Sequence, residues 1–188
     1  MTDNFIDKTF TVFADLILKI IPLPIRDKRA FAYYRTGLNY QSQGRYSESL
    51  KNYYRSLNLD EDPIDRSFTL YNIGLIYINL GLYKKALAYY EAALELNNYL
   101  PQALNGIAII YHDTACKLLK VNRLDEASSS FYNAKKYWTE AIYLSPDTYL
   151  EVENWLQQVD SPKFLEKKNR SLFGCIILID RKLINFSD

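Results

Sequence analysis

Apolar side chains recur along the chain at the three- and four-residue spacing of helices that bury one face. This spacing runs through 30–40, 67–77 and 101–111, and a second helical pattern follows each of these segments. Gly44 and Gly81 separate the members of the first two pairs, at points where a helix can end in a left-handed residue. The pattern therefore predicts pairs of helices joined by short turns.

Each helix pair repeats the one before it. Gly74 and Ala108 occupy equivalent positions 34 residues apart, and Gly37 precedes Gly74 by 37 residues. A period of 34 residues is that of the tetratricopeptide repeat (TPR), a helix–turn–helix unit. The extra residues of the first interval fall in the stretch 60–63, whose acidic side chains we expect to be solvated. Because one pair cannot bury its apolar face alone, the copies must stack.

Small residues and tyrosines have complementary roles in this predicted stack. A small residue lets two helix axes approach closely, and a tyrosine ring then fills the space between neighbouring helices. We therefore predict an all-α TPR solenoid, wound as a right-handed superhelix. The small positions are Gly37, Gly74, Ala108, Ser49, Ala86, Ser56 and Ala93, and the filling positions are Tyr40, Tyr77, Tyr111, Tyr53 and Tyr90.

The repeat and its flanks set the predicted boundaries. The third repeat carries an insertion over 113–130, which predicts longer helices that either cap the stack or form a partner-specific surface. The first helix is amphipathic, and it either covers the open end of the stack or contacts a membrane or a hydrophobic client. The predicted segments are an N-terminal amphipathic helix at 1–24, repeats at 30–66, 67–100 and 101–148, a capping helix at 149–160, and an unassigned C-terminal extension at 161–188.

The composition gives little support for catalysis or for nucleic-acid binding. The formal net charge is +1, which provides no long-range attraction to a polyanion. His112 is the only histidine, and Cys116 and Cys175 match no metal-ligand spacing. The sequence also lacks a glycine-rich phosphate loop. We therefore predict no catalytic residue, cofactor, metal or small-molecule substrate, and a hydrolase that uses His112 is the weak alternative.

One face of the first helix in each repeat is the predicted partner-binding groove. In stacked TPRs the second, fifth, ninth and twelfth residues of that helix line the concave surface. This face is apolar and aromatic at first and carries amides further on, which suits an extended or helical apolar peptide. The alternative is that the first helix or the C-terminal extension covers part of it. The predicted groove residues are Phe31, Tyr34, Leu38, Gln41, Phe68, Tyr71, Asn72, Leu75, Ile78, Gln102, Asn105, Ile109 and His112.

One class of TPR ligand is disfavoured by the same residues. Co-chaperones hold the terminal carboxylate of heat-shock proteins with Lys and Arg, because a buried carboxylate must be paired. This chain has Tyr34, Leu38, Gln102 and Gly106 at the corresponding positions, and only Asn72 fits the clamp. We therefore do not expect it to bind the acidic tail of a chaperone.

Several strings carry more than the generic TPR features, and they lie at 4–10, 62–67, 70–76, 100–103 and 153–156. These strings resemble one family, the photosystem I assembly protein of plastids and cyanobacteria, and the likeness covers about residues 3–158. The resemblance implies a three-repeat TPR chaperone, peripheral on the stromal face of the plastid (chloroplast) thylakoid membrane. Its expected partners are photosystem I core subunits, with a helper assembly protein as a candidate co-partner. A general TPR adaptor in another multiprotein complex is the alternative.

Overall fold

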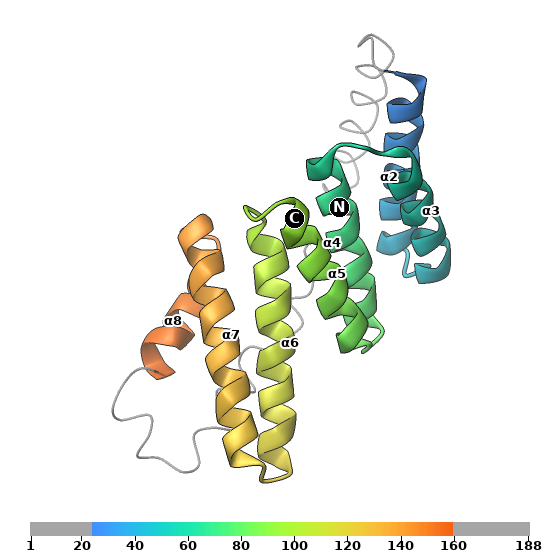
Figure 1. The fold of residues 1–188 in the computed structure, drawn as a ribbon. Coiled ribbons are helices and arrows are strands. Elements are labelled where there is room, and N and C mark those ends of the chain that lie inside the picture. The colour runs from blue at the N-terminus through green and yellow to red at the C-terminus, as the bar shows by residue number, and fades with distance from the viewer. Residues whose placement is uncertain (1–23, 160–188) are drawn as a thin grey trace, which may run out of the picture. The chain divides into compact units, whose positions relative to one another are not determined.

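The computed structural model describes residues 24–159, and all regular secondary structure in this range is helical (Figure 1). The all-α prediction is therefore confirmed for the described residues. The predicted first helix and the C-terminal extension lie outside them. The described helices are α2 (Ile25–Ser42), α3 (Tyr46–Leu59), α4 (Pro63–Asn79), α5 (Tyr83–Leu96), α6 (Pro101–Lys120), α7 (Leu124–Leu144) and α8 (Leu150–Val159).

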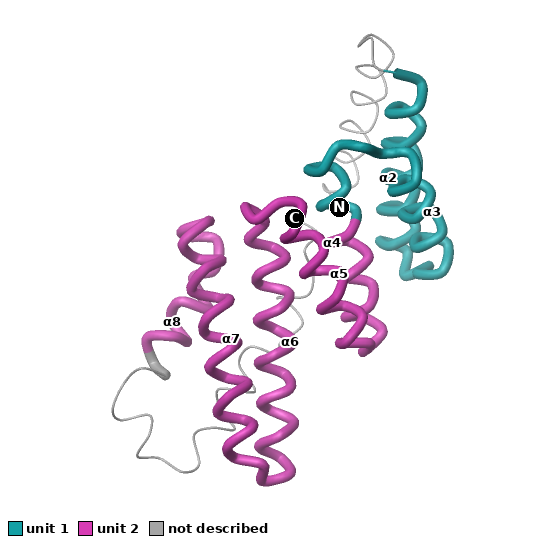
Figure 2. Tube along the Cα trace, in the orientation of Figure 1, with its two compact units in different colours: residues 1–69 teal, residues 70–188 magenta. Residues whose placement is uncertain are grey.

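The chain divides into two compact units, residues 1–69 and 70–188, and the division falls within α4 (Figure 2). In unit 1, α2 and α3 form one helix pair. An ideal Cβ on Gly37 of α2 would lie 2.6 Å from the ring of Tyr53 on α3, so only glycine permits this approach. Ser49 and Ser56 of α3 donate hydrogen bonds to the carbonyl oxygens of Gly37 (2.8 Å) and Ala30 (2.9 Å). The buried serine hydroxyls therefore satisfy their polar groups on the backbone that they pack against.

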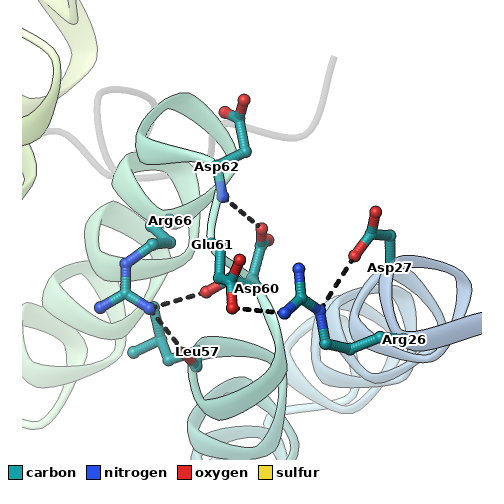
Figure 3. A network of polar contacts seen from close by, with 7 residues as sticks. All are labelled: Arg26, Asp27, Leu57, Asp60, Glu61, Asp62 and Arg66. Atoms are coloured by element: carbon teal, nitrogen blue, oxygen red, sulfur yellow. Dashed lines mark hydrogen bonds and ion pairs between the residues drawn. The ribbon is translucent and has the colours of Figure 1, made fainter. Parts of the chain in front are cut away.

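The turn between α3 and α4 is held by a local polar network (Figure 3). The Arg66 guanidinium donates to the carbonyl oxygens of Leu57 at 2.6 Å and Asp60 at 2.9 Å, near the C-terminal end of α3. Free carbonyls at a helix end need such donors, and a cation also matches the negative end of the helix dipole. Arg66 therefore ties the start of α4 to the end of α3.

The acidic residues of this turn are more than solvated charges. The Asp62 carboxylate accepts hydrogen bonds from the backbone N–H groups of Ile64 (2.8 Å) and Asp65 (3.1 Å), which caps the start of α4. Asp60 is half-buried and accepts from the backbone N–H of Asp62 at 3.1 Å. Burial raises the pKa of Asp60. Glu61 is exposed and pairs with Arg26 of α2. The expectation of simple solvation is thus wrong for Asp60 and incomplete for Asp62.

Unit 2 is organised around Tyr90, whose side chain on α5 is fully buried. An ideal Cβ on Gly74 of α4 would lie 2.6 Å from one edge of the Tyr90 ring. An ideal Cβ on Gly106 of α6 would lie 2.6 Å from the opposite edge. Tyr90 therefore lies between two glycines from successive first helices. This arrangement explains why a small residue and a tyrosine recur together in the sequence.

The third repeat differs from the second in the length of both helices. α6 has 20 residues and α7 has 21, whereas α4 has 17 and α5 has 14. The added length of α6 is held near α5 by Lys117, whose Nζ lies 2.6 Å from the Asp113 carboxylate and 4.3 Å from the centroid of the Tyr83 ring. A turn joins α6 to α7, and its residue Asn122 has a positive φ of 58°.

An aromatic cluster joins α6, α7 and α8. Trp138 of α7 and Trp155 of α8 meet edge to face, with ring centroids 5.2 Å apart. The ring of His112 on α6 lies 5.4 Å from each of them, and Phe131 lies 5.5 Å from His112. Tyr149 and Val152 add buried apolar surface from the start of α8. This cluster covers the end of the helix stack, where an apolar face would otherwise meet water.

Candidate partner-binding surfaces

Unit 1 exposes an apolar stripe on α2. Phe31, Tyr34 and Leu38 follow one another at three- and four-residue spacing, which places them on one face of the helix. Phe31 is 37% exposed and Leu38 is 36% exposed, while Tyr34 is half-buried. We name these three residues the α2 stripe. Because these apolar side chains adjoin on one helix face and keep part of their surface in water, they are a candidate contact surface.

The α2 stripe rests on a rigid support. The Tyr34 ring packs on the buried Tyr53 ring at a centroid distance of 5.9 Å, and the Tyr53 hydroxyl donates to Gln41 Oε1 at 2.7 Å. Burial raises the pKa of Tyr53 far above its usual range. Phe31 lies 6.5 Å from Tyr34, and the Arg35 guanidinium lies 5.9 Å from the centroid of the Phe31 ring. The side-chain oxygen of Gln41 therefore holds Tyr53, which supports the stripe, and it is not left to bind a ligand.

The predicted groove residues of α4 differ in exposure. Phe68, in unit 1, is 36% exposed. In unit 2, Leu75 and Ile78 are half-buried, whereas Tyr71 and Asn72 are buried. The Tyr71 ring stacks on Tyr90 at 5.8 Å and belongs to the core of unit 2. Tyr71 and Asn72 therefore contribute mainly to packing in this structure, and the accessible apolar surface of α4 comes from its other predicted residues.

On α6, the structure places Asn105 and His112 inside unit 2. Asn105 is 0% exposed, and its Oδ1 accepts a hydrogen bond from Trp138 Nε1 at 2.8 Å. His112 is enclosed by the aromatic cluster described above. Neither side chain faces solvent as the groove prediction assumed, because α7 and α8 cover that side of α6. Gln102 and Ile109 are half-buried and remain at the surface.

The tip of the longer α6–α7 pair exposes apolar side chains that the groove prediction did not include. Val121 is 63% exposed and Leu124 is 58% exposed, on either side of the turn. Arg123 beside them forms an ion pair with Glu126 at 2.5 Å. The signal in the sequence was the insertion itself, although the insertion alone did not indicate which of its side chains point outward.

The described residues offer no arrangement typical of a metal site or of a membrane span. Among residues 24–159, no three His, Cys, Asp or Glu side chains gather closely enough to hold a metal ion. No helix in the same range combines the length and the apolar character needed to cross a bilayer.

Two TPR family models match the chain, one over residues 32–63 and another over 67–99. Proteins named photosystem I assembly protein Ycf3 match it over most of its length. The one from Galdieria sulphuraria is 64% identical over 154 residues, covering 82% of this chain and 92% of the relative. The chain belongs to the Ycf3 family. Its relatives in Guillardia theta and Synechococcus elongatus are 58% and 50% identical, covering 82% and 86% of this chain and 90% and 93% of those proteins.

A solved structure supports the same fold. The first TPR of Spaghetti (RPAP3), bound to an HSP90 peptide SRMEEVD, superposes on this chain with a TM-score of 0.52. The alignment covers 71% of this chain and 91% of that one at 21% identity, so the likeness concerns the fold alone. The repeats and helices together show that residues 24–159 of this Ycf3 family member have an all-α TPR fold.

Proposed function

We propose that this chain is a non-catalytic assembly factor for photosystem I, and that it holds segments of core subunits on the α2 stripe. Family membership supports the photosystem, since the relatives are named photosystem I assembly proteins. The exposed faces of Phe31 and Leu38 support the site, and this is the observation on which the proposal chiefly depends. We also propose that the protein is peripheral on the stromal surface of the thylakoid and that a helper assembly protein is its co-partner.

The chemistry of the stripe defines the kind of client segment. Phe31, Tyr34 and Leu38 carry no charge, so binding is favoured when apolar side chains of the client leave water and pack against them. A helical client would place its own apolar residues at the same three- and four-residue spacing. An acidic terminal peptide fits poorly, because Tyr34 and Leu38 stand where a carboxylate clamp needs cations. The proposed client is therefore an apolar or amphipathic segment of a photosystem I subunit.

A paired-variant experiment tests this assignment. Phe31→Ser with Leu38→Ser removes the exposed apolar surface without touching the Gly37–Tyr53 packing. Leu80→Ser with Leu82→Ser is the matched control, because both leucines are similarly exposed in the α4–α5 turn. Each variant replaces the native gene copy in the source organism, and both photosystems are quantified spectroscopically.

The two variants should behave differently. We expect the stripe variant to lose photosystem I while photosystem II is retained, and the control to keep both. Equal loss of both photosystems, or full photosystem I in the stripe variant, would contradict the proposal. Affinity capture that recovers a complex without photosystem I subunits would instead favour a general TPR adaptor.

A further inference from the structure

The turn between α6 and α7 projects beyond the turn between α4 and α5, and both turns belong to unit 2 (Figure 1). The side chain of Lys117 on α6 reaches the ring of Tyr83 at the start of α5. From Lys117, α6 continues to Lys120, which adds about 4.5 Å along the helix axis. The last residues of α6 and the first of α7 therefore form a protrusion. We name this protrusion, residues 117–126, the α6–α7 tip.

Two large aliphatic side chains stand at the apex of the α6–α7 tip. Val121 and Leu124 each keep more than half of their surface in water, and the two residues between them are exposed as well. Both helices lead away from the apex, so the described part of the chain does not cover these side chains. An exposed apolar pair at a projecting turn gains free energy when a partner takes it out of water.

Cations surround this apolar apex. Lys120 is exposed and has no ion-pair partner among residues 24–159. Lys117 and Arg123 pair with carboxylates, but their own side chains are 60% and 58% exposed. Exposed ion pairs contribute little to stability, so these two cations can exchange a carboxylate for another anion. Counted with the start of α5, five cations meet three anions here, while the whole chain has a net charge of +1: Lys84, Lys85, Lys117, Lys120 and Arg123 against Asp113, Asp125 and Glu126.

This combination fits the surface of an anionic bilayer better than it fits a protein partner. A specific protein interface covers roughly 800 Å² on each side, and two aliphatic side chains on a turn cannot form the centre of one. A lipid surface requires no groove. Apolar side chains enter the boundary between headgroups and acyl chains, while Lys and Arg set back along the helices meet the headgroup phosphates.

We propose that the α6–α7 tip docks reversibly on an anionic lipid surface. Val121 and Leu124 enter the boundary between headgroups and acyl chains, and the cations of the tip pair with lipid phosphates. The inference rests on the membrane location that forms part of the proposed function, and it specifies which residues make the contact. The insertion in the third repeat then serves to carry this contact past the preceding turn.

Vesicle flotation with the full chain tests the apolar part of the contact. The probes are vesicles of phosphatidylglycerol and phosphatidylcholine in equal parts and vesicles of phosphatidylcholine alone. Val121→Ser with Leu124→Ser removes the apex, and Leu80→Ser with Leu82→Ser makes the same kind of change in the turn that lies behind the tip. We expect the parent and the control to bind the mixed vesicles equally. The partition constant of the apex variant should fall about tenfold or more, with unchanged helical circular dichroism.

A second pair of variants tests the charge. Lys120→Gln removes a cation from the tip, and Lys136→Gln removes an equally solvated cation from the middle of α7. Lys120→Gln should weaken binding to the mixed vesicles about fivefold, because each Lys or Arg near an anionic surface contributes a comparable attraction, and Lys136→Gln should leave it unchanged. Added salt should weaken the binding of the parent for the same reason.

Three results would overturn the inference. Equal binding by the apex variant and the parent would place the lipid contact elsewhere in the chain. Equal binding of the parent to neutral and mixed vesicles would remove the role of the cations. A parent that ignores vesicles, but binds thylakoid membranes until protease strips them, would assign the tip to a protein partner. The vesicles contain no photosystem, so each of these failures leaves the photosystem test of the α2 stripe standing.

Discussion

Gly106→Ala is the sharpest test of how unit 2 is packed. Alanine is preferred over glycine inside a helix by about 1 kcal/mol, so propensity alone predicts a more stable protein. The structure predicts the opposite, because the new Cβ would lie 2.6 Å from the Tyr90 ring, where carbon atoms normally stay about 3.5–4.0 Å apart. The ring cannot retreat freely, since Gly74 lies against its other edge.

The expected magnitude follows from these opposing effects. Overpacking a well-filled core typically costs ~1–3 kcal/mol, and the two-sided confinement of Tyr90 places this site at the upper end. After the gain in helix propensity, we expect a net loss of about 1–2 kcal/mol, or roughly 2–8 °C in the melting temperature for a chain of this size. Thermal and urea denaturation, followed by circular dichroism at 222 nm, measure the change.

Two further variants make this test specific. Gly37→Ala meets Tyr53 in unit 1, where Gly37 is the only described glycine that contacts the ring, so the loss of stability should be smaller. Tyr90→Leu provides space for the new methyl group, so adding Gly106→Ala in that background should cost little or even stabilise. A Gly106→Ala protein that is more stable than the parent by the propensity gain would refute the packing argument.

Three other changes test different parts of the fold. Ala93→Trp should destabilise by ~1–3 kcal/mol or more, because Ala93 is fully buried in the core of unit 2; unchanged stability would mean the helix register is wrong. Arg66→Ala should cost about 1–3 kcal/mol in urea denaturation by leaving the α3 carbonyls without their donor, whereas Arg26→Ala should change little because its ion pair is exposed. Equal effects would contradict this contrast. Burial raises the pKa values of Tyr53 and Tyr90, so above about pH 10 the unfolded chain releases protons that the folded chain keeps. Stability should therefore be level below that pH and fall above it, by up to about 1.4 kcal/mol per pH unit for each tyrosine, and Tyr90→Phe should flatten the decline in denaturation experiments from pH 8 to 11.

The sequence predicted the helix pairs because their packing requires rare residue combinations at a fixed period. The small residues Gly37 and Gly74 lie where the repeat predicted close helix approach, against the rings of Tyr53 and Tyr90. Gly44 and Gly81 both have the expected positive φ, of 71° and 70°. The period could not reveal the polar details. The alanines of the second repeat replace the serines of the first, so nothing in the pattern signalled that the serine hydroxyls bind backbone carbonyls of α2.

The candidate site was harder to predict because its residues were assigned by repeat position alone. Position five of the repeat gives the half-buried Tyr34 in unit 1, but in the third repeat it gives the fully buried Asn105. Asn105 accepts a hydrogen bond from Trp138 of the lengthened α7, and Tyr71 at the same position of the second repeat is also buried. The insertion breaks the period ahead of Trp138, so the register of α7 against α6 could not be read from the alignment. Periodicity is thus a good guide to fold and a weaker one to which side chains stay exposed.

The placement of the tryptophans gives this protein an optical reporter confined to one end. Trp138 and Trp155 are the only two in the chain, and both lie in the aromatic cluster of α6, α7 and α8. Indole emission therefore follows the loosening of that cluster and is insensitive to the α2–α3 pair, whereas circular dichroism follows every helix. Coincident melting curves from the two signals would indicate a single cooperative transition. Separate curves would show that the two units unfold at different temperatures.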